Sequence, residues 1–322
     1  MIERNQERIV ILILMHTKHP YQTNDSHLFD VEKIHSHIIR IRMPGNVFTY
    51  YIKGDNSGIL IDTGLGYGSL RSFLEDPASD LAFGQTYSVL LTHGHLDHAG
   101  GIGEFEEVYL HPADYDLALR HQDKDMRISY LRENGVTQSA EHIGQRLISA
   151  DASTTLRSCE DLKTLDLGGI CLTLIPLPGH TCGSLCILIK EPSVPDGILL
   201  TGDALNSWTL LFSAPDSPPM QVYHDALVHL KERYGGQFRQ VLYSHPHNIG
   251  GPEILDQMIE LTDEILSGRN SDASAILFMG KPALVAKPVD TETLLRRDGK
   301  LANVTYDPEN LTEENDLKRE QK

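Results

Sequence analysis

The sequence predicts an α/β fold, because short apolar runs with strand character alternate with helical stretches along a chain of 322 residues. Five of the apolar runs end at a residue type that binds metal ions, namely Asp62, His93, His180, Asp203 and His245. Open α/β sheets place their functional sites beyond the carboxyl ends of their strands. The five ends therefore predict one cleft in which these side chains converge.

The N-terminal half is predicted to be rich in strands. Residues 1–30 show no clear element and are expected to form an N-terminal arm of unclear structure. Strand-like runs follow in HIIRIRMP, VFTYYIK and GILI, and GDNSG between the last two is typical of a hairpin turn. A helix is expected around Ser69–Asp76, before strands in YSVLL and EEVYL. Residues 112–160 are charged and helical in texture, which predicts a helical insertion serving as a lid or as scaffold.

The C-terminal half alternates strands with two clear helices. Strands are expected around Leu165–Leu177 and in SLCILIK, GILLTGD and QVLYSH. QVYHDALVHLKERYG and PEILDQMIELTDEILSG have apolar residues at helical spacing and are predicted to be amphipathic helices. We therefore expect a catalytic domain over 31–270. Residues 271–322 are expected to form a small C-terminal extension, with a helix or short strands and a disordered charged tail.

The composition favours a protein that acts on small metabolites. The net charge of −17 repels phosphate backbones and anionic lipids, and Arg296–Arg297 is the one basic cluster. The apolar run Ile9–Met15 is too short to span a bilayer, and no secretion signal is visible. Four cysteines fit reduced side chains in an intracellular protein. We expect a cytoplasmic protein with a small-molecule substrate, no nucleic acid and no membrane, and a dimer stays an open alternative.

The stretch LLTHGHLDHAGG concentrates side chains that bind metals. His93, His95, Asp97 and His98 lie within six residues, and neither a helix nor a strand would point all four the same way. A loop leaving a strand can turn them inward, and Gly100–Gly101 allows tight passage of the backbone. Imidazole and carboxylate together suit Zn²⁺, with iron or manganese as competitors. With His180, Asp203 and His245 the set reaches seven donors, which suits two metals sharing a carboxylate.

The motifs that contain these residues resemble those of a known protein family. HGHLDH has the H-x-H-x-D-H pattern of the metallo-β-lactamase superfamily, and the supporting motifs IDTG, PGHTCGSL, TGDAL and YSHPHN follow in that family's order. The resemblance spans roughly residues 31–265. It implies a four-layer αβ/βα sandwich with the metals at one edge, between the two sheets. The chain thus resembles a metal-dependent hydrolase.

The resemblance also implies a role for each donor. The first metal would be held by His93, His95 and His180, and the second by Asp97, His98 and His245. Asp203 would bridge the two metals, and Asp62 would hydrogen-bond a ligand histidine from outside the coordination sphere. His247 is an alternative to His245 as the last ligand.

The ligand set implies a mechanism of hydrolysis. Two metals, expected to be Zn²⁺, lower the pKa of a bridging water so that hydroxide exists at neutral pH. That hydroxide would attack an ester, lactone, thioester or related bond, with Asp97 and Asp203 as catalytic residues and Asp97 able to orient the nucleophile. Asn206 stands where some lactone-cleaving relatives have a tyrosine, which weakens the lactonase interpretation.

Several alternatives stay open. A glyoxalase II-like thioesterase would grip a glutathione carboxylate, for which Lys281, Lys287, Arg296 and Arg297 are available. A mononuclear iron persulfide dioxygenase would leave the second set of donors without metal. A nuclease would need a basic arm to bind the phosphate backbone. A binding scaffold without enzymatic activity would not need a complete set of metal ligands. The loop 206–220 and the insertion are expected to shape the substrate pocket, with the candidate lining residues Asn206, Trp208, Phe212 and His247.

Overall fold

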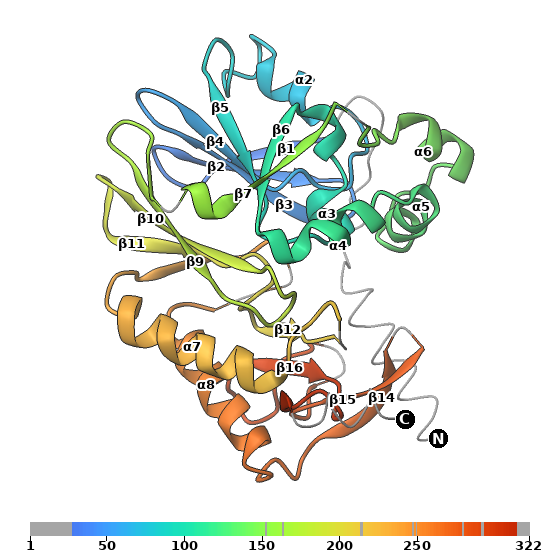
Figure 1. Ribbon diagram of the computed structural model, residues 1–322, viewed down its shortest axis with the longest axis vertical. Helices are drawn as coiled ribbons and strands as arrows, with labels where there is room; N and C mark the ends of the chain where they lie inside the picture. The colour runs from blue at the N-terminus through green and yellow to red at the C-terminus, as the bar shows by residue number, and fades with distance from the viewer. Residues whose placement is uncertain are drawn as a thin grey trace.

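The structure is a computed structural model that describes residues 28–313, apart from positions 152, 163, 213, 214, 247, 249, 279, 291 and 292. Two β-sheets lie face to face in it, and a smaller third sheet lies at one end (Figure 1). Most of the predicted N-terminal arm, residues 1–27, and the tail residues 314–322 lie outside the described residues.

The first sheet has seven strands in chain order. They are β1 (Asp30–Lys33), β2 (Ile38–Met43), β3 (Val47–Lys53), β4 (Gly58–Ile61), β5 (Tyr87–Leu90), β6 (Glu107–Leu110) and β7 (Thr155–Ser158). Strands β1 to β4 pair antiparallel, whereas β4 to β7 pair parallel. Because parallel strands end at the same edge, the residues that follow β4 and β5 lie together.

The second sheet has five strands in the order β13-β11-β10-β9-β8. They are β8 (Thr164–Asp166), β9 (Cys171–Pro176), β10 (Leu185–Glu191), β11 (Val194–Leu200) and β13 (Gln240–Leu242). β11 and β13 run parallel, and the remaining neighbours are antiparallel. Asp203 and His245 therefore follow adjacent strands at one edge of this sheet.

Strand β10 is apolar from Leu185 to Ile189, because both of its faces are covered there. Leu185, Ile187 and Ile189 point into the core between the two sheets, whereas Cys186 and Leu188 point into the core on the other face. Successive side chains of a strand alternate between faces, so a strand covered on both faces has no polar positions to spare.

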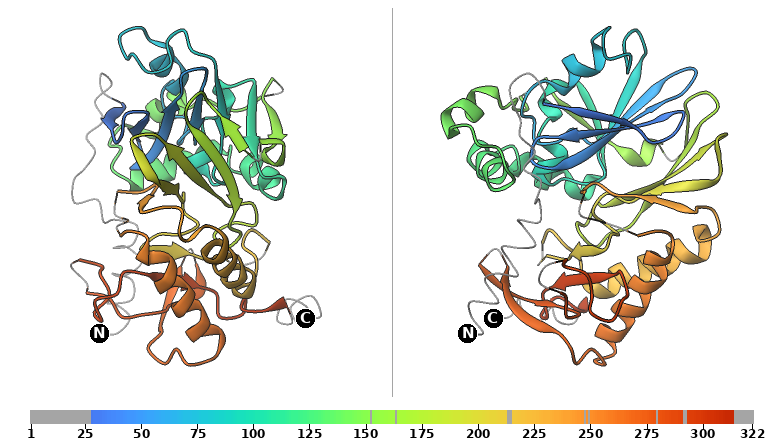
Figure 2. Two further views of the ribbon diagram at one scale, coloured as in Figure 1. Left: turned by 90° about the vertical axis from the view of Figure 1, so that its left-hand side faces the viewer. Right: turned by 180° about the vertical axis from the view of Figure 1, so that it is seen from behind.

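Helices cover the outer faces of both sheets (Figure 2). On the first sheet, α2 (Leu70–Glu75) buries Leu70 and Leu74, and the Ser69 hydroxyl accepts the Ser72 N–H as an N-cap. On the second sheet, α7 (Met220–Tyr234) and α8 (Glu253–Leu266) bury their apolar stripes. The layer order is helix, sheet, sheet, helix, so the predicted four-layer α/β sandwich is confirmed.

The stretch expected to be a helical insertion holds three α-helices and ends differently. Its helices are α4 (Tyr115–Arg120), α5 (Lys124–Glu133) and α6 (Ala140–Arg146), preceded by the short 3-10 turn η2 (Pro112–Asp114). Strand β7 then pairs with β6 at the edge of the first sheet. The expectation of helical structure up to residue 160 is therefore wrong at its end. The half-exposed edge strand has the polar composition that suggested a helix.

The third sheet joins two distant parts of the chain. Its strands, in the order β12-β16-β15-β14, are β12 (Trp208–Leu210), β16 (Asn303–Tyr306), β15 (Lys281–Val285) and β14 (Ser274–Phe278). Residues 206–220 were predicted to be a loop, and β12 corrects this. A strand of three residues exists only through its pairing with β16, which no local pattern reveals.

His35 and His37 lie in the bend between β1 and β2. None of the helices within the described part of residues 28–313 has the length and apolar character needed to span a bilayer.

Candidate metal centre

The predicted donors meet in two neighbouring clusters at one edge of the sheets. His93 follows β5, and the short helix α3 (Leu96–Ala99) carries Asp97 and His98. His180, Asp203 and His245 lie in the loops after β9, β11 and β13. The structure groups His93, His95 and His180 in one cluster, and Asp97, His98, Asp203 and His245 in the other. Within each cluster the donor atoms lie within 4.8 Å of one another.

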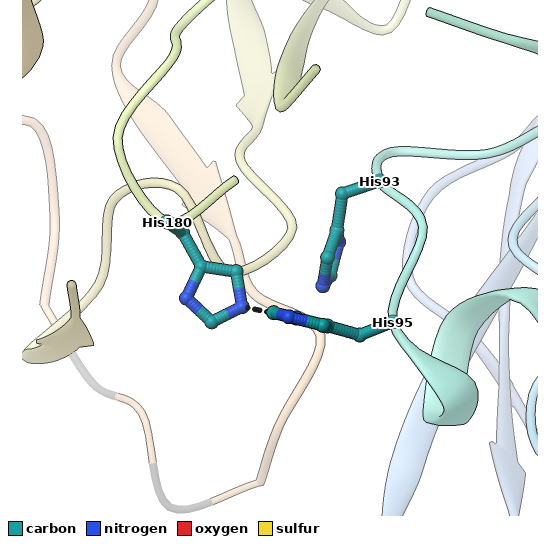
Figure 3. Close-up of side chains that lie close together, drawn as sticks. All are labelled: His93, His95 and His180. Carbon is teal, nitrogen blue, oxygen red and sulfur yellow. Dashed lines mark hydrogen bonds between the residues drawn. The ribbon is translucent and has the colours of Figure 1, made fainter. Parts of the chain in front are cut away.

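The first cluster, here called the trihistidine cluster, is shown in Figure 3. His95 Nδ1 and His180 Nε2 are 2.8 Å apart, and the His93 ring centroid lies 4.8 Å from those of His95 and His180. His93 Nε2 is buried and has no hydrogen-bond partner among the described residues. A buried nitrogen without a partner costs free energy unless it binds something, and this one faces two more imidazole nitrogens.

The second cluster, the carboxylate cluster, is centred on two acidic side chains. His245 Nε2 lies 3.1 Å from Asp203 Oδ2 and 3.4 Å from Asp97 Oδ2. His98 Nε2 lies 3.6 Å from Asp203 Oδ2 and 3.7 Å from Asp97 Oδ2. Asp203 Oδ2 is also 3.7 Å from His180 Nε2 of the other cluster, so this oxygen lies between the two sets.

These separations fit metal ions. Tetrahedral ligands bound at about 2.0–2.1 Å are about 3.3 Å apart, close to the distances in the carboxylate cluster. His98 Nε2 and Asp203 Oδ1 are buried without a hydrogen-bond partner in the described part of the chain. Buried polar atoms are almost always satisfied. The orphaned atoms in both clusters are therefore explained by the donor chemistry of imidazole and carboxylate toward a divalent ion.

In four of the five histidines of the two clusters, the ring nitrogen that points away from the cluster has a hydrogen-bond partner. His98 Nδ1 lies 2.9 Å from Asp62 Oδ2, so Asp62 lies where the resemblance implied. The other partners are Thr92 Oγ1 at 3.0 Å for His93, the Leu210 carbonyl at 2.7 Å for His180 and the Asn46 carbonyl at 3.3 Å for His245. Such partners set the tautomer, so that the remaining nitrogen presents a lone pair to a metal.

Asp62 is held in an unusual backbone conformation. Its φ of 66° is in the left-handed region, which residues other than glycine rarely adopt. Its carboxylate accepts the Thr92 N–H at 2.7 Å and the Thr92 hydroxyl at 2.9 Å, besides His98. The strained turn after β4 thus places one carboxylate against both the residue Thr92 after β5 and His98 on helix α3.

The two clusters differ in their electrostatics. Burial lowers the pKa of His93, His95 and His180, so these imidazoles are neutral. In the carboxylate cluster burial also disfavours charged imidazole, but the facing carboxylates outweigh it. They hold the pKa of His98 well above its usual value and raise that of His245 to about 10.

The pKa values of the two carboxylates in this cluster shift in the opposite direction to those of its histidines. Burial would raise the pKa of Asp97 and of Asp203, but the facing imidazoles of His98 and His245 lower both well below the usual range. Without metal, the carboxylate cluster therefore stores protons on its histidines and negative charge on its acids.

Asp114 is a residue that sequence reasoning missed. It is 1% exposed, and its carboxylate accepts the Gly94 N–H at 2.9 Å, the Thr181 hydroxyl at 2.6 Å and the Gly183 N–H at 2.7 Å. These groups flank the three histidines of the trihistidine cluster. A Cβ on Gly183 would lie 2.6 Å from Asp114 Cγ, so glycine allows this close approach. Asp114 thus joins the two loops that carry these histidines, and the sequence hinted at a role only through its position four residues after the strand EVYL.

Tyr130 is the second residue missed. It lies on α5, and its hydroxyl donates to Asp97 Oδ2 over 2.7 Å. The same helix carries Arg127, which is fully buried and donates to the Gly100 carbonyl at 2.7 Å and the Ile148 carbonyl at 2.7 Å. Helix α5 is thereby anchored to the segment directly after helix α3. No sequence signal could have singled out Tyr130, because its partner is 33 residues away.

A cavity of about 950 Å³ opens onto both clusters. The predicted pocket residues Asn206, Trp208 and Phe212 line it, whereas His247 lies outside the described residues. Trp208 also donates its indole N–H to Thr305 Oγ1 at 2.8 Å, so its orientation depends on the third sheet. Further lining comes from α5 and from the hairpin of β14 and β15.

Comparison with known proteins identifies the family. The sequence model described as the metallo-beta-lactamase superfamily matches residues 42–233. The chain belongs to the metallo-beta-lactamase superfamily, as the motifs predicted. A solved motif mutant of a metallo-beta-lactamase from Cronobacter sakazakii shares the fold at a TM-score of 0.50 and 16% identity, over 74% of this chain and 96% of that one.

Two named proteins are similar to this chain in sequence. The acyl-coenzyme A thioesterase MBLAC2 of Homo sapiens is 27% identical over 217 residues, which cover 64% of this chain and 75% of that protein. The cytoplasmic isozyme of hydroxyacylglutathione hydrolase from Saccharomyces cerevisiae is 30% identical over 144 residues, 42% of this chain and 43% of that protein. The predicted enzyme class, a metal-dependent hydrolase, is confirmed.

Proposed function

We propose that this protein is a dinuclear metal hydrolase that cleaves the thioester bond of a small acyl thioester. The observation that carries the proposal is the pair of adjacent donor clusters, with Asp203 Oδ2 between them, that both line one cavity. The names of two relatives, an acyl-coenzyme A thioesterase and a hydroxyacylglutathione hydrolase, support a thioester among the bonds that such a centre can cleave.

The ligand assignment follows the two clusters. His93, His95 and His180 would hold the first ion, and Asp97, His98 and His245 the second. Asp203 would contact both. Two divalent ions, proposed to be zinc, would supply hydroxide at neutral pH and polarise the attacked carbonyl.

The chain's own residues prepare this site. Asp62, Thr92 and the Leu210 carbonyl orient imidazoles toward the ions. Asp97 keeps its ligand oxygen in place through Tyr130, and it can also orient the nucleophile. A substrate bound in the cavity would displace water around its reacting carbonyl, which would strengthen each electrostatic contact there.

The described cavity wall offers one lysine or arginine side chain to the thiol part of a substrate. Of the four basic residues considered for a glutathione grip, Lys287 pairs with Glu264, Arg296 with Asp298, and Arg297 donates to the Val289 carbonyl. Lys281 alone lines the cavity. The glyoxalase II-like alternative therefore depends on Lys281, and Lys281→Ala should raise KM for a glutathione thioester but not for an uncharged thiol.

Metal content and a thioester panel test the proposal. Protein purified without added metal is expected to hold two zinc ions per chain. His245→Ala should hold one, and His224→Ala, a remote histidine bonded to Thr262, should still hold two. Chelation should abolish thioester hydrolysis. One iron per chain with oxygen uptake on persulfides would instead establish the dioxygenase alternative.

A further inference from the structure

An apolar surface, here called the aromatic track, begins in contact with the trihistidine cluster. The Phe212 ring centroid lies 5.2 Å from that of His95 and 5.3 Å from that of His180. Phe278 continues the track, with its ring centroid 5.7 Å from that of Phe212. Both phenylalanines line the cavity. A continuous path of aromatic rings thus leads from two ligand histidines to the third sheet.

The third sheet builds the rest of the track. Trp208 and Phe278 are buried in a small core with Ile276, Val285 and Val289, against which Phe212 packs. Beyond them, Leu277 lines the cavity yet is 64% exposed. A large apolar side chain left open to solvent beside a cavity marks a surface that another apolar group can cover.

The remaining lining has a different character. Glu133 is the last residue of α5 and Asn134 its C-cap, Asp216 comes from the loop before α7, and Asp307 from the chain after β16. These side chains disfavour a carboxylate or phosphate against their own part of the cavity wall, apart from a contact with Lys281. They can bind amides and hydroxyls, which the aromatic track cannot satisfy by hydrogen bonds.

We propose that the aromatic track binds the acyl group of the thioester, so that the enzyme selects apolar acyl chains. The proposal rests on the function proposed above. A thioester has an acyl substituent and a thiol substituent on its reacting carbonyl carbon. The carriers of acyl groups contain amides that need hydrogen-bond partners. The substituent next to the rings is therefore the hydrocarbon.

A series of acyl thioesters of one uncharged thiol tests this in the full-length metal-loaded protein. Burying one methylene against the track should raise kcat/KM about 4-fold, from acetyl up to the length that fills the cavity. A flat series would overturn the proposal while leaving the proposed function intact. If kcat/KM rose with the length of an apolar thiol instead of the acyl group, the proposal would be overturned as well.

Substitutions in the aromatic track test whether it is the part of the protein that selects for longer acyl groups. Leu277→Ser and Phe278→Ala should each lower the ratio of octanoyl to acetyl kcat/KM, by roughly 10-fold for Phe278→Ala. Leu277 is exposed, so its variant tests the track without the loss of core packing that Phe278→Ala risks. Leu295→Ser is the matched control, because Leu295 is 45% exposed but does not line the cavity. An equal change in Leu295→Ser would overturn the proposal.

A binding measurement separates this proposal from turnover. Trp208 is the single tryptophan and lines the cavity, so its fluorescence reports occupancy. Octanoate should shift it at much lower concentration than acetate, and Leu277→Ser should reduce that difference. Equal midpoints for the two acids would overturn the track. If octanoate binds but no thioester is cleaved, the proposed function fails and the track stands.

Discussion

Raising the pH should load the two metal sites to different extents, because their histidines start from different protonation states. The imidazoles of the trihistidine cluster have lowered pKa values, so they carry no proton that a metal must displace above about pH 6.5. In the carboxylate cluster, the pKa of His245 is about 10 and that of His98 is also raised. Each of these side chains binds a proton at pH 7, and a metal must remove it.

The size of the effect follows from the pKa of His245. A pKa of about 10 places the neutral imidazole about 4 kcal/mol above the charged form at pH 7. The affinity for the second metal should therefore rise about tenfold per pH unit for His245, and more steeply if His98 also releases its proton. This dependence of the second-site affinity on pH persists below the raised pKa values, and it disappears as the pH approaches 10. The affinity for the first metal should stay nearly constant from pH 7 to 9.

Zinc titrations against a competing chelator at pH 6.5, 7.5 and 8.5 measure both affinities. Calorimetry in two buffers of different ionisation enthalpy counts the protons released by each metal. His245→Ala should lose the second zinc ion together with the proton release that accompanies its binding, whereas His224→Ala should keep both. Equal slopes for both metals, or no proton release with the second, would refute the assignment of charge to the carboxylate cluster.

Three substitutions test the residues that hold the ligands. Asp114→Asn keeps the shape of the side chain but turns one acceptor into a donor, so Tm should fall by roughly 5 °C. First-site zinc affinity should fall about 10-fold as well; a normal affinity would show that the two loops need no clamp. Tyr130→Phe should weaken the second metal about 10-fold in chelator competition, while Tyr87→Phe, which loses a hydroxyl bonded to Glu75, should not. Asp62→Asn removes the carboxylate from beside His98 and should lower second-site affinity about 10- to 100-fold, and the same titration returning the original affinity would exclude an orienting role.

Most of the sandwich was predictable from local patterns. Helix α2 lies within the expected Ser69–Asp76, because a capping serine and apolar spacing are both encoded locally. The strands β3, β4, β10 and β11 follow from apolar runs between turn residues. The seven expected donors lie in two clusters, because parallel strands end at one edge and carry their last residues there.

Other features depended on contacts between distant parts of the chain. Strand β12 forms only because β16 supplies its hydrogen bonds, so residues 206–210 look like a loop in the sequence. Asp114 and Tyr130 have ordinary neighbours in the sequence. Their roles arise because folding brings a carboxylate to the N–H groups of Gly94 and Gly183, and a hydroxyl to Asp97.

The sequence by itself determined the donor types, their order and the strands that they follow. Those properties are written in short stretches whose periodicity and turn residues act locally. The tertiary structure alone decided which groups orient the donors, and which side chains from the third sheet form the cavity wall. Hydrogen bonds and packing between distant segments depend on where the folded backbone places each atom, and no spacing in the chain encodes that position.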